Sequence, residues 1–263
     1  MTAAGHHLAP LLDDPGATGI FSDFDGTLSP IVDDPAAAEP LPGAVGVLAD
    51  LARRFAVVGV ISGRPAAFLL RHVGDVGVSM WGLHGLETVK HGRVVPVLEA
   101  EPWLEVVEDV AAAAVAELGP DVDVERKGLS LTVHFRRTQA QGPAVRDWAR
   151  RTVEATGLLL HDARMSYELR PPVEHGKGLV LERVAAGLSA ACFIGDDWSD
   201  AEAFDALDRL AATGVTAVRV GVRSEEAPTR LLERADVVLD GPEAVLETLR
   251  SLLSPSAGGG PPP

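Results

Sequence analysis

Two carboxylates spaced two positions apart, Asp23 and Asp25, follow an apolar run and precede Gly26 in the stretch 20–28. Side chains on an extended strand alternate between faces, so these two carboxylates can point the same way. At the carboxyl end of a parallel strand they would face the crevice where open α/β sheets bind ligands. Such a pair could serve as nucleophile and general acid/base, or bind a hard cation. A D-x-D-G string is also compatible with a plain Asx-type turn, so the rest of the chain has to decide.

Two further polar clusters lie at predicted helix starts. Ser62-Gly63-Arg64 follows an apolar run, and its hydroxyl and backbone N–H groups could cradle an anion or simply cap the helix. Lys177 lies between two glycines, where the helix dipole disfavours a cation. That position indicates an anion-binding role, with a solvated surface lysine as the alternative.

Adjacent carboxylates, Asp196 and Asp197, end another apolar run, with Asp200 close behind. Acidic residues before a helix can be mere capping. Four polar clusters at one edge of one sheet, however, indicate a single shared site. Because Mg²⁺ prefers octahedral oxygen ligands and substrate phosphate, the sequence predicts a magnesium site built from Asp23, Asp25, Asp196 and Asp197.

This set of residues fits the hydrolysis of a phosphate monoester, which is among the slowest uncatalysed reactions. We expect Asp23 to attack phosphorus and Asp25 to protonate the leaving oxygen and then activate water. Lys177, the third residue expected to be catalytic, would supply positive charge next to the phosphate. The residues expected to hold the phosphate are Ser62, Gly63, Arg64 and Lys177.

The elements that must position these residues alternate between buried strands and helices, which predicts an α/β fold with a Rossmann-like parallel sheet. Strands are expected over 20–24, 55–61, 76–81, 191–195, 216–220 and 236–239. Helices are expected over 42–54, 176–186 and 242–253, with others after residues 65 and 200.

The pattern changes in the middle of the chain, where helices over 103–118 and 143–155 alternate with paired strands over 122–126, 130–135, 158–163 and 166–169. This α+β pattern predicts a separate lobe inserted into the first domain. The expected division is a loose leader at 1–18, a catalytic core at 19–86 and 171–253, an inserted cap at 87–170 and a disordered tail at 254–263.

The composition is that of an ordinary globular protein, with 263 residues, 46% hydrophobic and 23% charged. Lys+Arg 23 and Asp+Glu 38 give 23 − 38 = −15, which argues against nucleic acid and anionic membrane as partners. The single cysteine, Cys192, lies in an apolar run and is expected in the core, without a disulfide. The sequence shows no membrane span or signal peptide, so we expect a cytoplasmic location. We also expect a monomer.

Four motifs, D-x-D-G-T at 23–27, S-G-R at 62–64, Lys177 and G-D-D at 195–197, resemble in order and spacing those of the haloacid dehalogenase (HAD) superfamily phosphatases. Over nearly its whole length the chain resembles the trehalose-6-phosphate phosphatase family. That narrower resemblance rests on GLHG at 82–85, ERKGLSLTVHFR at 125–136, ELRPPVEHGKG at 168–178 and GDDWSDAEAF at 195–204.

The resemblance implies a Rossmann-like core with a mobile α/β cap, and a requirement for Mg²⁺. It implies that Asp23 is the nucleophile, that Asp25 is the acid/base and a metal ligand through its backbone carbonyl, and that Asp196 is a metal ligand. The family usually has Glu after the Asp of the last motif, whereas this chain has Ala201 before Glu202. This departure leaves the metal ligands in place but puts the role of that Glu in doubt.

The cap is expected to select the substrate. The resemblance places Lys127, His134, Arg136 and Glu168 where such phosphatases contact sugar hydroxyls, although these side chains could also simply solvate a hairpin. Polar groups in a closed pocket discriminate strongly, because an analogue without the partner hydroxyl leaves them unpaired.

The predicted function is a Mg²⁺-dependent phosphatase that converts trehalose 6-phosphate to trehalose and phosphate, with a small sugar phosphate as its partner. The alternatives are a phosphatase for another sugar or cyclitol phosphate, such as sucrose 6-phosphate or a trehalose-like pseudo-disaccharide phosphate, a non-catalytic sensor, and a mutase.

Overall fold

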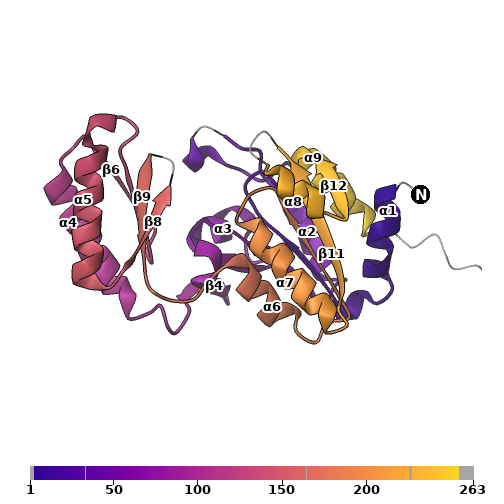
Figure 1. Ribbon diagram of the computed structural model, residues 1–263. Coiled ribbons are helices and arrows are strands. Elements are labelled where there is room, and N and C mark those ends of the chain that lie inside the picture. The colour runs from indigo at the N-terminus through magenta and orange to yellow at the C-terminus, as the bar shows by residue number, and fades with distance from the viewer. Residues whose placement is uncertain (1–2, 33, 164, 225–226, 255–263) are drawn as a thin grey trace, which may run out of the picture. The chain divides into compact units, whose positions relative to one another are not determined.

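Two compact units make up the computed structural model, which describes residues 3–32, 34–163, 165–224 and 227–254 (Figure 1). The larger unit combines Met1–Gly85, Val89–Arg93 and His175–Pro263, and the smaller unit combines Leu86–Thr88 with Val94–Glu174. Within the described residues, no helix is long and apolar enough to cross a membrane.

A large sheet has the strand order β12-β11-β10-β1-β2-β3-β4-β5. From β12 to β3 the neighbouring strands run parallel, which confirms the predicted α/β fold with a parallel sheet. In chain order the strands are β1 (Thr18–Ser22), β2 (Val57–Ile61), β3 (Ser79–Gly82), β4 (Glu87–Lys90), β5 (Arg93–Pro96), β10 (Ala190–Gly195), β11 (Thr216–Arg223) and β12 (Val237–Asp240).

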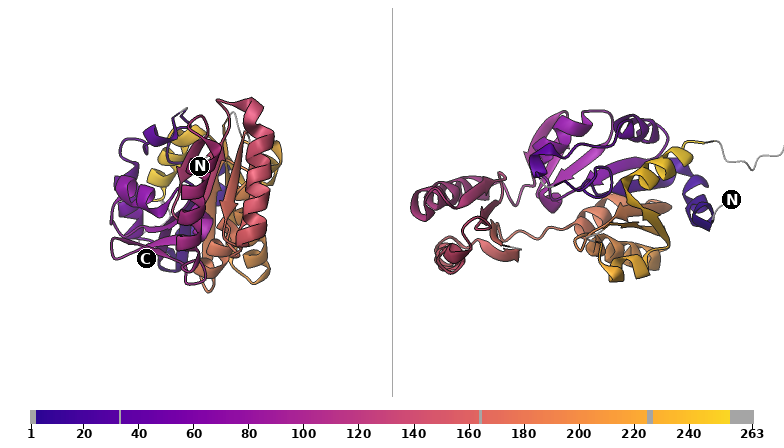
Figure 2. Two further views of the ribbon diagram at one scale, coloured as in Figure 1. Left: turned by 90° about the vertical axis from the view of Figure 1, so that its left-hand side faces the viewer. Right: turned by 90° about the horizontal axis from the view of Figure 1, so that it is seen from above.

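Helices cover both faces of this sheet, as Figures 1 and 2 show. Successive strand residues alternate between the two cores: Ile20 and its partner Cys192 lie in one, and Phe21 and its partner Phe193 in the other. The first core is covered by α1 (Ala3–Leu8), α2 (Ala44–Ala52), α3 (Ala66–Val73) and α9 (Gly241–Ser251), the second by α6 (Lys177–Ala185), α7 (Asp200–Ala212) and α8 (Thr229–Arg234). Cys192 is buried, as expected, and burial raises the pKa of its thiol to about 12.

The first strand lies two residues earlier than expected, since β1 ends at Ser22 rather than at Phe24. The backbone N–H of Asp23 still donates to the carbonyl of Ile194 at 2.8 Å, so Asp23 is the last residue tied to the neighbouring strand. The chain then turns at Gly26, which has a φ of +70°. Asp23 and Asp25 therefore do not alternate along one strand, and their carboxylates go to different partners.

The expectation of a loose leader at 1–18 is wrong for its described part. Helix α1 and two short 3-10 turns, Ala9–Leu12 and Pro15–Ala17, precede β1. Leu8 and Leu11 are buried in the first core, three positions apart on one side of the segment. Prolines and glycines hid this short apolar stripe in the sequence. The expected tail lies outside the described residues from position 255 onward.

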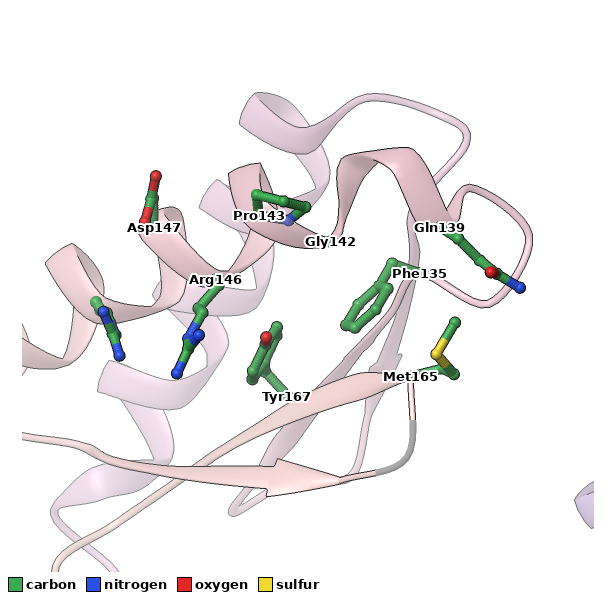
Figure 3. Close-up of a pocket in the computed structure, with 9 residues that line it drawn as sticks. Phe135, Gln139, Gly142, Pro143, Arg146, Asp147, Met165 and Tyr167 are labelled. Atoms are coloured by element: carbon green, nitrogen blue, oxygen red, sulfur yellow. The ribbon is translucent and has the colours of Figure 1, made fainter.

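The smaller unit contains a four-stranded antiparallel sheet with the order β6-β7-β9-β8. Two helices share a core with one face of this sheet, and Figure 3 shows Tyr167 of β9 beneath one of them. The elements are α4 (Trp103–Leu118), β6 (Asp123–Arg126), β7 (Leu131–His134), α5 (Gly142–Thr156), β8 (Leu159–Ala163) and β9 (Ser166–Arg170). This is the α+β pattern expected from the sequence.

Candidate active site

Asp23 lies at the carboxyl end of β1 and is buried, with a relative exposure of 4%. Its Oδ1 is 3.0 Å from Nζ of Lys177, yet this oxygen has no hydrogen-bond partner among the described residues. Burial raises the pKa of the Asp23 carboxyl well above its usual value, against the opposing charge of Lys177. A buried carboxylate oxygen with spare capacity is suited to accept a cation or to attack an electrophile.

Lys177 is the first residue of α6 and is fully enclosed, at 1% exposure. Its Nζ donates to Oδ1 of Asp200 at 2.7 Å and lies 3.9 Å from Oδ1 of Asp197. Burial alone would lower the pKa of the ammonium, but the carboxylates of Asp200, Asp23 and Asp197 together raise it. The surrounding carboxylates offset both the desolvation and the unfavourable helix dipole, so Lys177 stays charged.

The glycines on either side of Lys177 have a packing reason. A Cβ at Gly176 would lie 2.4 Å from Oε2 of Glu202, and a Cβ at Gly178 would lie 2.4 Å from the backbone oxygen of the same residue. Gly176 also has a φ of +152°, which L residues rarely adopt. Glu202, the residue after Ala201, therefore packs against the start of α6 and helps to fix Lys177 there.

Asp200 is a buried acceptor at the start of α7, a role that the sequence does not predict. One carboxylate oxygen accepts from Lys177, and the other accepts from the backbone N–H groups of Asp196 at 2.8 Å and Asp197 at 2.9 Å. Burial is the largest cause raising its pKa to about 6. Gly195 leaves room for this carboxylate, since a Cβ at position 195 would lie 2.3 Å from Cγ of Asp200. The available signal was an Asp four residues after Asp196, in the first turn of a helix.

Asp197 and Asp196 differ in environment although they are adjacent. Oδ1 of Asp197 accepts from the backbone N–H and the hydroxyl of Ser199, and its pKa is lowered because the charge of Lys177 and these hydrogen bonds outweigh burial. Asp196 is buried, and its Oδ2 accepts from Ser224 at 3.2 Å. Burial and the neighbouring carboxylate of Asp200 raise the pKa of Asp196 to about 7.

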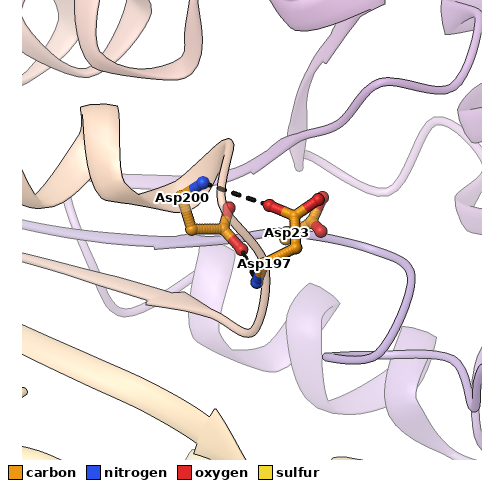
Figure 4. Close-up of side chains that lie close together, drawn as sticks. All are labelled: Asp23, Asp197 and Asp200. Carbon is orange, nitrogen blue, oxygen red and sulfur yellow. Dashed lines mark hydrogen bonds between the residues drawn. The ribbon is translucent and has the colours of Figure 1, made fainter. Parts of the chain in front are cut away.

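We refer to Asp23, Lys177, Asp196, Asp197 and Asp200 as the sheet-edge cluster. Ligand atoms of Asp23, Asp197 and Asp200 lie within 4.8 Å of one another. Figure 4 shows these three side chains close together. This group suits a hard divalent cation, because every donor atom is a carboxylate oxygen and two of the three residues are buried. In addition, Oδ1 of Asp23 has no hydrogen-bond partner among the described residues. Since both oxygens of Asp200 are already engaged by hydrogen bonds, Asp200 fits a positioning role better than a ligand role.

Asp25, expected beside Asp23, forms a separate pair with Arg64. Its two oxygens accept from Nε and Nη2 of Arg64 at 2.8 and 2.6 Å, in a bidentate arrangement. The same guanidinium donates to the carbonyl of Pro35 at 2.6 Å and lies over the ring of Phe68. The guanidinium of Arg64, which was predicted to bind phosphate, thus binds the carboxylate of Asp25 in this structure.

Ser62 and Gly63 follow β2, where the loop η4 (Leu83–Gly85) packs against them. The backbone N–H of His84 donates to the carbonyl of Ser62, and its imidazole Nε2 would lie 2.9 Å from a Cβ at Gly63. The carbonyl of His84 also accepts from Gly176, the residue before Lys177. His84 therefore links two of the predicted phosphate-binding segments, a role that the string GLHG did not reveal.

In the smaller unit, Glu168 and His134 lie on the sheet face that points away from the core under α4 and α5. Glu168 accepts from the hydroxyl of Ser130 at 3.0 Å. The carboxylate of Glu125, which was not predicted, accepts from Nε2 of His134 at 3.1 Å and lies 3.6 Å from Nζ of Lys127. Its pKa is lowered, chiefly by the hydrogen bond to His134 and further by the charge of Lys127.

Two more residues of this face are missing from the sequence prediction. The hydroxyl of Thr132 and Nε of Arg170 are buried and have no hydrogen-bond partner among the described residues. Thr132 lies opposite Glu168 in the strand register, and Arg170 is two positions further along β9. Each lies two positions along its strand from a predicted residue, Thr132 from His134 and Arg170 from Glu168. Because side chains two positions apart on a strand share a face, this spacing could have identified them. Arg136, by contrast, lies beyond the end of β7 and is exposed.

A model of the trehalose-phosphatase family matches residues 21–235 of the chain. Among curated relatives, the trehalose-phosphate phosphatase of Mycobacterium leprae is 35% identical over 248 residues, which are 87% of this chain and 56% of that protein. The Mycolicibacterium paratuberculosis protein of the same name is 37% identical over 203 residues, 72% of this chain and 51% of that one. The chain thus spans just over half the length of these relatives.

Solved structures share the fold. A trehalose-6-phosphate phosphatase related protein has a TM-score of 0.73 at 23% identity, covering 89% of this chain and 96% of that one. The C-terminal domain of the Candida albicans trehalose-6-phosphate phosphatase has a TM-score of 0.69 at 25% identity, covering 96% and 97%. A haloacid dehalogenase-like hydrolase from Bacteroides thetaiotaomicron has a TM-score of 0.60 at 14% identity, covering 89% and 99%, so the likeness to it concerns the fold alone.

Proposed function

Because the chain belongs to the trehalose-phosphatase family, we propose that it hydrolyses trehalose 6-phosphate to trehalose and inorganic phosphate through an aspartyl-phosphate intermediate. The observation that carries this proposal is the buried Asp23, whose Oδ1 forms an ion pair with Lys177 at 3.0 Å but has no hydrogen-bond partner among the described residues. A carboxylate nucleophile needs a free oxygen and nearby positive charge on which the transferred phosphoryl group can settle.

In the first step, an oxygen of Asp23 attacks phosphorus, and the bond between phosphorus and the sugar oxygen breaks. Asp25 gives its proton to the leaving sugar oxygen. In the second step, Asp25 takes a proton from water as the water oxygen attacks the same phosphorus, which releases phosphate and restores the Asp23 carboxylate. Lys177 stabilises the negative charge of the phosphoryl oxygens in both steps, and Ser62 and the backbone N–H of Gly63 hold the phosphate.

Asp23, Asp196 and Asp197, with the main-chain carbonyl of Asp25, would hold Mg²⁺. The ion would neutralise charge on the phosphoryl group. Asp200 positions Lys177 and the backbone of the metal-binding loop through its buried hydrogen bonds. The expected cytoplasmic location and monomeric state stay predictions from the sequence.

The bidentate contact changes the role that we assign to Arg64. Both oxygens of Asp25 accept from the guanidinium here, so this pair has to open before Asp25 can donate a proton. Arg64 is therefore proposed to hold the acid/base in this resting position rather than to bind the phosphate. Its contacts to Pro35 and Phe68 restrict the guanidinium, so that Asp25 is presented in one orientation.

For the substrate, we propose that Lys127, His134 and Glu168 contact the sugar hydroxyls from the smaller unit, together with Glu125, Thr132 and Arg170 on the same face. Thr132 and Arg170 each leave a buried polar atom available for a ligand. Arg136 is retained as a candidate contact because it belongs to the same family string.

The test is phosphate release from trehalose 6-phosphate, sucrose 6-phosphate and glucose 6-phosphate, with Mg²⁺ and with EDTA. We expect trehalose 6-phosphate to be hydrolysed fastest and only with the metal. Asp23→Asn should lower the rate by about 10³-fold or more and abolish an acid-stable phosphoenzyme trapped by rapid quenching. Asp50→Asn, a change at an exposed helical carboxylate, is the control. A faster rate on another sugar phosphate would overturn the substrate, whereas near-parent activity of Asp23→Asn would overturn the mechanism.

A further inference from the structure

A groove in the smaller unit lies outside the residues that the proposed reaction uses. Its volume is about 490 Å³, within the range of sites for small ligands. We define this α5 groove by six of its lining residues: Phe135, Gln139, Arg146, Arg150, Met165 and Tyr167. It lies at the end of the sheet beside α5, as Figure 3 shows.

The floor of the α5 groove is aromatic. The rings of Phe135 and Tyr167 are stacked, with centroids 5.4 Å apart and an interplanar angle of 27°. Gly142, the first residue of α5, allows the helix to approach closely, since a Cβ there would lie 3.1 Å from the Phe135 ring. The two rings are therefore held by packing on the sheet side and leave part of their surface accessible to a planar group.

Positive charge lines the wall of the groove. Arg146 and Arg150 are four residues apart on α5 and so lie on the same side of the helix. Among the described residues neither guanidinium has a hydrogen-bond or ion-pair partner, in a chain with a net charge of −15 where many other arginines are paired with carboxylates. Figure 3 shows the Arg146 side chain running down from α5 beside the Tyr167 ring, while the Asp147 carboxylate points away.

This groove is separate from the face proposed to contact sugar. Tyr167 packs with the core beneath α4 and α5, whereas the next residue, Glu168, points to the opposite face of the sheet. A molecule in the α5 groove would thus be separated from Glu168 by the thickness of the sheet.

We propose that the α5 groove binds a small anion that carries a flat aromatic ring, of the class of nucleoside phosphates. The ring would stack on Tyr167 and Phe135, and the phosphate would accept hydrogen bonds from Arg146 and Arg150. Arginine suits this pairing because its planar guanidinium presents parallel donors to phosphate oxygens and also stacks on aromatic rings. An aromatic surface beside a cation is the arrangement by which proteins hold bases and phosphates together.

The test is calorimetric titration of the full chain with AMP in EDTA, where the metal-dependent site does not compete. Adenosine supplies the ring without the anion, and ribose 5-phosphate supplies the anion without the ring. We expect AMP to bind more tightly than either fragment. The paired substitution Arg146→Gln/Arg150→Gln should weaken AMP binding by about tenfold or more, because two charge-assisted contacts are lost. Arg151→Gln, an exposed neighbour on another side of α5, should leave it unchanged.

Two outcomes would overturn the proposal: no binding of AMP, or equal binding by the parent and the paired variant. Equal affinity for AMP and ribose 5-phosphate would show that the ring is not recognised, and would overturn it as well. Tyr167→Leu, which removes the aromatic ring, should reduce the preference for AMP over ribose 5-phosphate, and circular dichroism checks that the variants fold. Since binding is measured without turnover, the result is independent of whether trehalose 6-phosphate is the substrate.

Discussion

The sheet of the smaller unit carries Glu125, His134 and Glu168, with Lys127 beside Glu125, on the side away from its core, which we call the polar face. The sheet-edge cluster of the larger unit and this polar face both place carboxylates beside cations, but they do so in different dielectric surroundings. At the sheet edge, Lys177 and Asp200 are enclosed and hold each other at 2.7 Å. On the polar face, Lys127 and Glu125 are 3.6 Å apart and partly exposed. A charge in the sheet-edge cluster is stabilised by its charged partners, whereas a charge on the polar face is stabilised largely by water.

This difference separates the region proposed to carry out the chemistry from the region proposed to contact the substrate. The enclosed cluster tolerates little change, because removing one charge leaves the remaining buried charges without a partner that compensates them. The polar face can change residues at low cost in stability, so the sugar specificity that we propose for it could vary while the proposed reaction stays the same. Substitutions at matched positions test this division.

The largest effect is expected for Asp200→Ala. Loss of this carboxylate leaves two backbone N–H groups without their acceptor. It also removes the carboxylate that accepts from the buried ammonium of Lys177 at 2.7 Å. We expect the free energy of unfolding to fall by about 3–5 kcal/mol, measured by urea denaturation. The matched change on the polar face, Glu125→Ala, should cost less than about 1 kcal/mol. Equal losses in the two variants would contradict the comparison.

A smaller effect is expected for Gly26→Ala. The φ of +70° is unfavourable for alanine, and the new Cβ would lie 2.1 Å from Oδ2 of Asp196. We expect a loss of about 2–4 kcal/mol in stability, together with weaker Mg²⁺ binding because Asp196 is displaced. Gly187→Ala is the control, since φ is +86° but no atom lies within 4 Å of the added carbon. It should cost only about 1–2 kcal/mol from backbone strain and leave metal binding unchanged.

Mg²⁺ binding should be coupled to the ionisation of the sheet-edge cluster. The pKa of Asp196 is about 7 without metal, so this carboxyl is substantially protonated below pH 7. Because a cation binds the carboxylate form, we expect Mg²⁺ to release protons and its apparent affinity to rise with pH up to about 7. Calorimetry at pH 6.5 in two buffers of different ionisation enthalpy measures the protons released. Asp196→Asn should release fewer; unchanged release would show that another group supplies them.

The smallest effect is expected for Glu125→Gln. The pKa of Glu125 is lowered in the folded protein, so its contribution is fully present above the pKa of the unfolded chain and is lost as pH falls through the folded pKa. Since the side chain is 47% exposed, the contribution at neutral pH should be about 0.5 kcal/mol or less. The stability difference between parent and variant should therefore shrink on acidification. A difference that grew at low pH would contradict the assignment.

The sequence predicted the fold well because its signals are local. Apolar runs such as 191–195 mark strands buried on both faces, and the helical spacing of the middle lobe marks α4 and α5. The short segments before β1 escaped prediction because Leu8 and Leu11 become recognisable as core residues only once the sheet exists to cover them.

Prediction of the site was uneven for a similar reason. Motif spacing identifies Asp23, Lys177 and Asp196 as neighbours, but it says nothing of which pairs form. The partnership of Asp25 with Arg64 depends on β1 ending at Ser22, so that Asp25 lies beyond the strand. The buried acceptor role of Asp200 depends on the absence of a side chain at Gly195. The sequence signal for Glu125 was only its place in the alternating pattern of the expected strand 122–126. That position alone does not indicate a role in the site.

The strand order of the large sheet has a consequence for folding during synthesis. Strand β1 pairs with β10, which lies about 170 residues later in the chain, with Ile20 opposite Cys192. A nascent chain that has released β1 to β3 therefore exposes the edge of β1 until β10 leaves the ribosome. The smaller unit, almost all of it the continuous segment Val94–Glu174, emerges in between and can close its own core first. Slowing translation after residue 174 should thus prolong exposure of the β1 edge and increase its pairing with other chains.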